Sequence, residues 1–354
     1  MKEIFQPNEF VSVRCLTQIS EMRNRAKVSK VHLADKRLKM VIANHVNKAF
    51  FEKQVLRDVS FHIKEGERVG VIGLNGSGKT TLMRILMGAL RADSGYVRVA
   101  GEKPWERQGK RKKRIGFVSA LSSNLHPDRT VEDSVNLCRK MYPEAWKASE
   151  SDLEIVDYVK ERLKIKDVWK EVRSSLSLGE GMRAEFLYAV MMNPHLLIMD
   201  EPTTGMDYEM RMKEYECLEY FRQCKKDMPV TVLLVTHSIQ EMERLCDRVI
   251  AIHHGQIIFD GAMEYLQQRY LSLGKICFET EEGVLHFHDM PVKKYEIDGK
   301  RVQIIFDKRY VSANIILQQL MEETEIKKIR FFDMDMETII RNLYQENQRL
   351  LSKQ

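Results

Sequence analysis

The chain has 354 residues, of which 31% are charged and 44% belong to the hydrophobic set, and its formal net charge is +6. This composition is typical of a globular protein with one main domain and a smaller one. No apolar run approaches the roughly 18 to 20 residues that span a bilayer, and the first ten residues lack the apolar region of a secretory signal. We therefore expect a cytoplasmic protein that needs a partner chain for any work in a membrane.

Most of the positive charge lies in residues 1–39, which carry nine Lys or Arg against four Asp or Glu. The rest of the chain is nearly neutral, so no direct contact with nucleic acid is expected. The basic segment has weak periodicity, and we expect the folded domain to begin at Met40 and to fold without it. The six cysteines show no C-x-x-C spacing and are interpreted as free thiols of a reducing compartment.

From Met40 onward, strand and helix patterns follow one another. Apolar stretches at 40–43, 55–63 and 67–72 predict strands, and a glycine-rich loop then precedes a helix with apolar residues at helical spacing from 82 to 89. Residues 132–188 read as a helical insertion. Further strands are predicted at 96–99, 115–118, 196–199, 230–235, 249–252 and 256–259. The runs at 196–199 and 230–235 do not alternate, which is typical of central parallel strands covered on both faces. The predicted fold class is α/β, with a P-loop core and a helical subdomain.

Residues 263–354 predict a small α+β accessory domain. Alternation at 276–308, with turns at Glu282-Gly283 and Asp298-Gly299, indicates hairpins. Helical patterns at 312–323 and 336–350 flank a short strand at 328–332. The predicted division is therefore a basic extension at 1–39, a nucleotide-binding domain at 40–262 and an accessory domain at 263–354.

The glycine-rich loop at 73–80 matches the pattern G-x-x-x-x-G-K-[ST] between a strand and a helix. In such a loop, backbone N–H groups point at phosphate oxygens at the positive end of the following helix. Lys79 is expected to contact the β- and γ-phosphates, and the Thr80 hydroxyl to bind Mg²⁺. The predicted ATP-binding residues here are Gly73, Leu74, Asn75, Gly76, Ser77, Gly78, Lys79, Thr80 and Thr81.

Two carboxylates, Asp200 and Glu201, follow the apolar strand at 196–199. Ligands gather at the carboxyl ends of strands in open α/β sheets. Asp200 is therefore expected to hold Mg²⁺, and Glu201 to polarise the attacking water.

Three further motifs follow in the order of one known family. Ser177 and Gly179 lie within Leu-Ser-Leu-Gly-Glu at 176–180, Asp207 ends Thr-Gly-Met-Asp, and His237 follows the strand at 230–235. These segments resemble the signature motif, the D-loop and the switch histidine of ATP-binding cassette (ABC) ATPases, a likeness that covers about residues 40–261. The leucine at 178 is similar to that of some drug, polysaccharide and viologen-type exporter ATPases.

The resemblance implies roles for these residues. Phe50 would stack on adenine and His237 would sense the γ-phosphate. Two cassettes, identical or closely related, would dimerise head to tail, with Ser177, Gly179 and Glu180 of one closing on the ATP of the other. It also implies ATP hydrolysis coupled to transport by a separate transmembrane permease, which would hold the chain at the inner face of the membrane.

The sequence departs from the family pattern at three places. Leu178 and Glu180 replace the commoner glycine and glutamine of the signature motif. The segment 115–121 aligns with the Q-loop, yet Ala120 or Leu121 stands where the family has a glutamine. We expect slow ATPase activity of the isolated chain for this reason, unless Ser122, Ser123 or Asn124 substitutes through a shifted loop.

Two alternatives to the exporter subunit remain open. One is a soluble ABC ATPase that acts in protein, iron–sulfur or ribosome remodelling, and the other is a regulatory cassette that binds ATP without turnover. The single P-loop, the accessory domain and the leucine at 178 favour the exporter.

Overall fold

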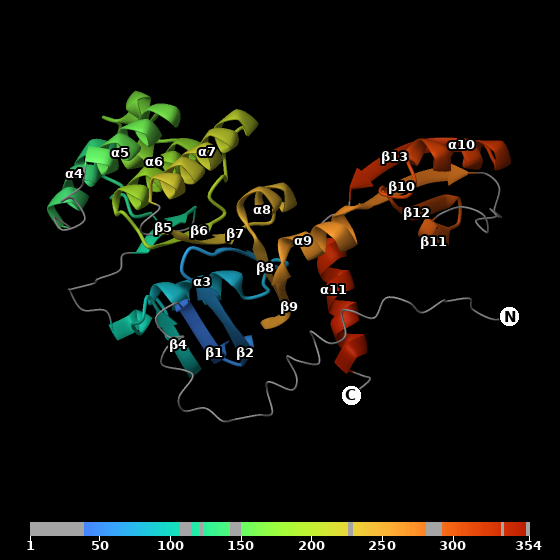
Figure 1. Cartoon of the computed structure of the whole chain (residues 1–354), viewed down its shortest axis with the longest axis horizontal. Helices are drawn as coiled ribbons and strands as arrows, with labels where there is room; N and C mark the ends of the chain where they lie inside the picture. The colour runs from blue at the N-terminus through green and yellow to red at the C-terminus, as the bar shows by residue number, and fades with distance from the viewer. Residues whose placement is uncertain are drawn as a thin grey trace.

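The computed structural model describes residues 39–106, 115–120, 123–141, 150–225, 229–280, 292–333 and 336–351 (Figure 1). The basic segment up to residue 38, Leu121, Ser122 and the Glu282-Gly283 turn lie outside the described residues. Within the described part, no helix is both long enough and apolar enough to cross a bilayer.

A six-stranded sheet forms the centre of the molecule. Its strands are β3 (Arg68–Ile72), β5 (Ile115–Ser119), β6 (Leu196–Asp200), β7 (Thr231–Val235), β8 (Arg248–His253) and β9 (Gln256–Ala262). They lie in the order β5-β6-β7-β3-β8-β9, with every neighbouring pair parallel except β8 and β9. Every residue of β6 and β7 is buried, which confirms the interpretation of their continuous apolar runs.

A second, antiparallel sheet covers the P-loop helix. It consists of β1 (Lys39–Phe50), β2 (Lys53–Lys64) and β4 (Ser94–Val99), in the order β2-β1-β4. The helix α3 (Lys79–Met87) buries Leu82 and Leu86 in one cluster with Val41 of β1 and Ile198 of β6. The P-loop helix is thereby fixed between the two sheets.

The helical subdomain follows β5 in the chain and lies on the far side of the central sheet from β1 (Figure 1). The predicted helical insertion is confirmed. Its helices are α4 (Val131–Met141), α5 (Glu150–Arg162) and α6 (Leu178–Met191), with short 3₁₀ turns at Ile165–Val168 and Arg173–Ser175. With α7 (Tyr208–Cys224) they bury Val135, Val159, Phe186 and Phe221 in one large cluster. Two further helical elements are α8 (Ile239–Leu245) and a 3₁₀ turn at Pro104–Glu106, the latter in contact with α3 and β4.

Residues 273–333 form a separate small sheet covered by one helix. The strands are β10 (Leu273–Thr280), β11 (Val292–Asp298), β12 (Arg301–Asp307) and β13 (Ile326–Asp333), in the order β11-β12-β10-β13, and the helix is α10 (Ala313–Glu323). The sheet has its own core, which includes Ile276, Ile304 and Ile316. The predicted turn at Asp298-Gly299 joins β11 to β12 as expected, since Asp298 pairs with Arg301.

The last helix, α11 (Met336–Leu351), returns to the nucleotide-binding part. It contacts β8 and β9, and Ile339, Ile340 and Leu343 are buried in the same cluster as the helical subdomain. The ring centroid of Tyr344 lies 4.5 Å from that of His253. The connecting elements α9 (Met263–Leu266) and the π-helix Gln267–Leu271 also join this cluster, through Met263, Leu266 and Tyr270. The segment after residue 262 therefore contributes both a separate sheet and a part of the main core.

Candidate functional site

The P-loop runs from the end of β3 to the start of α3 and leaves no room for a larger side chain at its first glycine. A Cβ at Gly73 would lie 2.4 Å from the carbonyl oxygen of Ile252. Gly78, which precedes α3, has a φ of 109°, a value that residues with a side chain rarely adopt. The loop therefore delivers the first N–H groups of α3 to an open cavity, where a helix N-terminus favours an anion.

Lys79 holds the shape of the loop. Its Nζ donates hydrogen bonds to the carbonyl oxygens of Gly73 at 2.7 Å and Leu74 at 3.2 Å. Burial lowers the pKa of Lys79, and the nearby Glu201 and Asp200 charges oppose this shift. Phosphate oxygens bound next to Lys79 would give its ammonium group anionic hydrogen-bond acceptors.

Asp200 and Glu201 lie at the carboxyl end of β6, beside the P-loop. Asp200 is 7% exposed, and burial, followed by the charge of Glu201, raises its pKa. Glu201 has a φ of 53°, in the left-handed region that a glutamate rarely adopts. Its N–H donates to the carbonyl oxygen of Val235, and its own carbonyl accepts from the Thr204 hydroxyl, at 2.8 Å each. Backbone strain that neighbours hold in place is a feature of functional sites.

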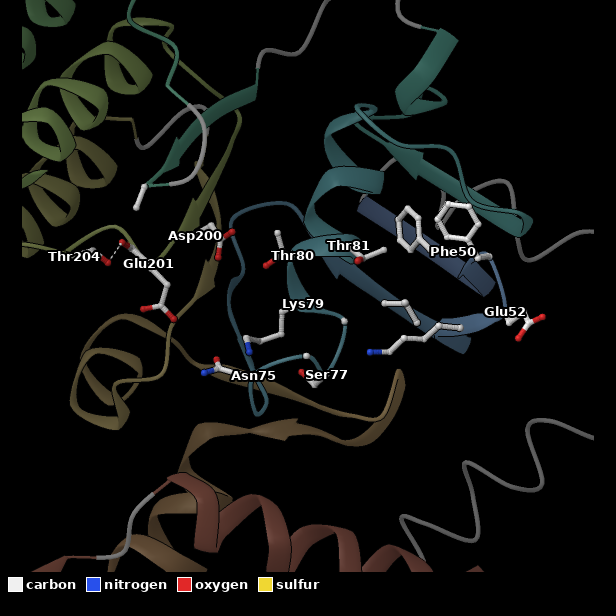
Figure 2. Close-up of a pocket in the computed structure, with 16 residues that line it drawn as sticks. Phe50, Glu52, Asn75, Ser77, Lys79, Thr80, Thr81, Asp200, Glu201 and Thr204 are labelled. Carbon is white, nitrogen blue, oxygen red and sulfur yellow. Dashed lines mark hydrogen bonds between the residues drawn. The ribbon is translucent and has the colours of Figure 1, made fainter. Parts of the chain in front are cut away.

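One cavity of 1240 Å³ joins these groups to an aromatic end. Figure 2 shows Lys79, Thr80, Asp200 and Glu201 around one end and Phe50 at the other. The predicted residues that line the cavity are Phe50, Asn75, Gly76, Ser77, Gly78, Lys79, Thr80, Thr81, Asp200 and Glu201. Gly73 and Leu74 take part through the carbonyl groups that bind Lys79.

Five lining residues were not predicted as site residues. Thr204 follows Glu201 by three residues, and the other four are Phe51, Glu52, Lys53 and Val55. These four come from the tight connection between β1 and β2, where Phe50 pairs with Lys53. Phe51 is fully exposed and has a φ of 53°. The two adjacent phenylalanines were the available signal, because an aromatic pair at a turn is unusual unless a ligand or partner covers it.

His237 follows β7, the neighbour of β6 in the sheet, and its side chain reaches Glu201. Its Nδ1 lies 2.8 Å from Oε2 of Glu201, and its side chain is 81% exposed. The preceding residue, Thr236, is buried and donates its hydroxyl proton to Glu241, which fixes the start of this loop. Glu201 and His237, which were predicted with separate roles, are thus brought together by adjacent parallel strands.

The signature residues begin helix α6 and do not line the cavity of their own chain. Ser177 is the N-cap of α6 and forms a capping box with Glu180: the Glu180 N–H donates to the Ser177 hydroxyl oxygen at 3.4 Å, and the Ser177 N–H donates to Glu180 Oε2 at 2.9 Å. The Ser177 hydroxyl also donates to Glu180 Oε2, at 2.6 Å. Gly179 packs against the D-loop backbone, since a Cβ there would lie 2.5 Å from the Gly205 carbonyl oxygen. Asp207 caps α7 by accepting from the Met210 N–H at 2.8 Å. The backbones of the signature motif and the D-loop are therefore in direct contact.

The loop after β5 places Ala120 in the cavity lining, and Leu121 lies outside the described residues. Of the three residues that could replace the missing glutamine, Ser122 lies outside the described residues, and Ser123 and Asn124 do not line the cavity. Both side chains bind the carboxylate of Glu185 on α6.

The side chains around the P-loop suit a magnesium–nucleotide complex. The Thr80 hydroxyl and the Asp200 carboxylate face one another in Figure 2, and such oxygen ligands are the ones that Mg²⁺ prefers. Burial, and then the charge of Glu201, raises the pKa of Asp200, and a bound cation would favour its ionised form. Glu201 is partly open to water at the same edge.

Comparison with known proteins agrees with this geometry. Residues 56–204 match the family model described as ABC transporter. An uncharacterized ABC transporter ATP-binding protein of Methanocaldococcus jannaschii is 31% identical over 250 residues, which cover 68% of this chain and 87% of that protein. The Nod factor export ATP-binding protein I of Paraburkholderia xenovorans is 35% identical over 232 residues, covering 61% and 69%. Among solved structures, a dimeric ATP-binding cassette in a post-hydrolysis state with ADP and Pi is 26% identical, with a TM-score of 0.52 over 63% of this chain and 99% of that one.

Proposed function

Because this chain belongs to the ABC transporter family as an ATP-binding subunit, we propose that it binds and hydrolyses Mg-ATP to drive export through a separate membrane-spanning partner. The observation that carries the ATPase part is the meeting of Lys79, Thr80, Asp200 and Glu201 around one end of a single cavity. The solved cassette with ADP and Pi supports hydrolysis as the reaction.

Each group of residues has its own role in phosphoryl transfer to water. The P-loop N–H groups and Lys79 hold the phosphates. Thr80 and Asp200 would hold Mg²⁺, which supplies positive charge to the phosphate oxygens when bound. Glu201 accepts a proton from the attacking water, and His237 orients Glu201 through its Nδ1.

A second cassette completes the site in this proposal. Ser177 and Gly179 lie at a helix N-terminus but outside their own cavity, so they suit an anion carried by another subunit. The cassette solved as a dimer supports this arrangement. The partner cassette is a second copy of this chain or a close paralogue.

The Nod factor export proteins support export as the direction of transport. The chain would then act at the inner face of the membrane, bound to a permease.

The proposal is tested with Lys79→Ala. The phosphates lose their main cationic contact, so we expect nucleotide binding to fall below detection in a fluorescent-ATP titration and phosphate release to stop. Lys170→Ala, an exposed change in the helical subdomain outside the cavity, is the control and should retain turnover. Unchanged ATP binding by Lys79→Ala would contradict the site. ATPase activity that does not respond to the co-expressed permease would contradict the coupling.

A further inference from the structure

A buried carboxylate joins the loop beside the nucleotide cavity to the signature helix. Glu185 lies on α6, about two turns after the N-cap Ser177, and it is 0% exposed. Its carboxylate accepts hydrogen bonds from the Asn124 N–H at 3.1 Å, the Asn124 side-chain amide at 2.9 Å and the Leu125 N–H at 3.4 Å. The Ser123 hydroxyl donates to it as well.

The same loop is tied to the central sheet. The Asn124 side-chain amide also donates to the carbonyl oxygen of Phe117 on β5, at 2.8 Å. Strand β5 ends at Ser119, which pairs with Asp200 in the sheet, and the next residue, Ala120, lines the cavity. Asn124 therefore connects the strand beside Asp200 to the carboxylate on α6.

Burial makes this connection hard to break. A buried carboxyl group that loses its hydrogen-bond partners is strongly destabilised, so separation of the loop from Glu185 is unfavourable. Leu125 and Phe186, the chain neighbours of the two partners, belong to the same hydrophobic cluster. A displacement of the loop consequently carries α6 with it.

We propose that Glu185 is a positioning residue that transmits nucleotide occupancy from the chain's own cavity to its signature motif, which serves the partner subunit. This inference rests on the proposed function, because it requires the signature motif to act in trans. Glu185 is fully buried and does not line the nucleotide cavity. Its effect passes through Asn124 on one side and through α6 on the other.

The test compares Glu185→Gln and Asn124→Ala with the parent chain. Glutamine keeps the size of the side chain but turns an NH₂ group toward the N–H donors of the loop. We expect the ATP Kd to stay within about twofold, since the P-loop is intact, while kcat falls about ten- to a hundredfold through misplaced catalytic geometry. The double variant should be no slower than the slower single variant, because both remove one connection.

Hydrogen exchange does not depend on turnover, so it distinguishes this positioning role from a contribution of Glu185 to fold stability alone. Hydrogen exchange with and without ATP should report protection at both the P-loop and residues 177–183 in the parent, but at the P-loop alone in the two variants. Glu214→Gln, another buried glutamate in the same subdomain, is the control and should keep both responses.

Retained protection of residues 177–183 in Glu185→Gln, or an unchanged kcat, would overturn the inference. If Glu185→Gln fails to fold, the same kcat and hydrogen-exchange measurements on Asn124→Ala test the inference. A parent chain that binds ATP without hydrolysing it would refute the proposed ATPase function, and the exchange measurement would still decide the role of Glu185.

Discussion

His237 and Glu201 form a pair at the rim of the cavity, with Nδ1 of the imidazole 2.8 Å from Oε2 of the carboxylate. They follow two adjacent parallel strands, and the N–H of Glu201 is bound to the last residue of the strand that leads to His237. The strained backbone of Glu201 is held by this contact and by Thr204. The carboxylate is therefore fixed in place before any nucleotide binds.

The first prediction concerns Glu201→Gln. The amide cannot accept a proton from water, so we expect ATP binding to persist while phosphate release falls by about a hundredfold or more. The variant should accumulate as an ATP-bound dimer, which sedimentation with ATP would detect. Glu243→Gln, an exposed change on α8, is the control and should hydrolyse ATP normally. Parental turnover by Glu201→Gln would show that another group activates the water.

The second prediction concerns the carboxylate of the signature motif. The hydrogen bonds from Ser177 lower the pKa of Glu180, so it is ionised at neutral pH and holds the hydroxyl that would contact the partner's γ-phosphate. Glu180→Gln preserves the capping box and removes the negative charge. Removal of the repulsive charge is worth roughly 1 kcal/mol at each of the two sites of a symmetric dimer, so ATP-driven dimerisation should tighten about thirtyfold.

Sedimentation measures this dimerisation in the Glu201→Gln background, where ATP is not consumed. Ser177→Ala, which loses the cap and the phosphate contact together, should weaken it. An equal or weaker dimer of Glu180→Gln would contradict the repulsion.

The third prediction concerns a buried acid with no catalytic role. Glu214 on α7 is 2% exposed, and its pKa is raised well above the usual value by burial, then by the charge of Glu241. The folded state binds this proton more tightly than the unfolded state does. Its contribution to stability is therefore complete below about pH 4.4 and is lost as the pH rises through the raised value.

Glu214→Gln mimics the protonated form of the side chain, so the loss of stability with rising pH should not occur. We expect a higher Tm than that of the parent at pH 8, by about 2–4 °C for each kcal/mol gained, and a difference that shrinks toward pH 5. Thermal unfolding at a series of pH values provides the measurement. Glu243→Gln should follow the parent curve, and a Glu214→Gln gain that does not depend on pH would rule out titration as the cause.

The sequence predicted the parts of the molecule that depend on local pattern. The P-loop, the Asp200-Glu201 pair and the strand at 196–199 were each indicated by residue type and spacing, and the strands lie within about two residues of most predicted ends. The contact between Glu185 and residues 123–125 was not predictable, because it joins segments about sixty residues apart. Phe51 was missed for a different reason: the adjacent phenylalanines at 50 and 51 were visible in the sequence, but only Phe50 was assigned to the site.

The return of α11 has a consequence for how the chain folds during synthesis. The main core contains Phe186 and Val135 from the helical subdomain and also Ile339, Ile340 and Leu343 from the last helix. A ribosome that has released residues 39–262 has therefore exposed an apolar surface whose cover is still to be made, about eighty residues later. Such a surface is a site for chaperones or for misassembly until the helix docks. The order of translation thus leaves the last step of cassette folding to the final helix.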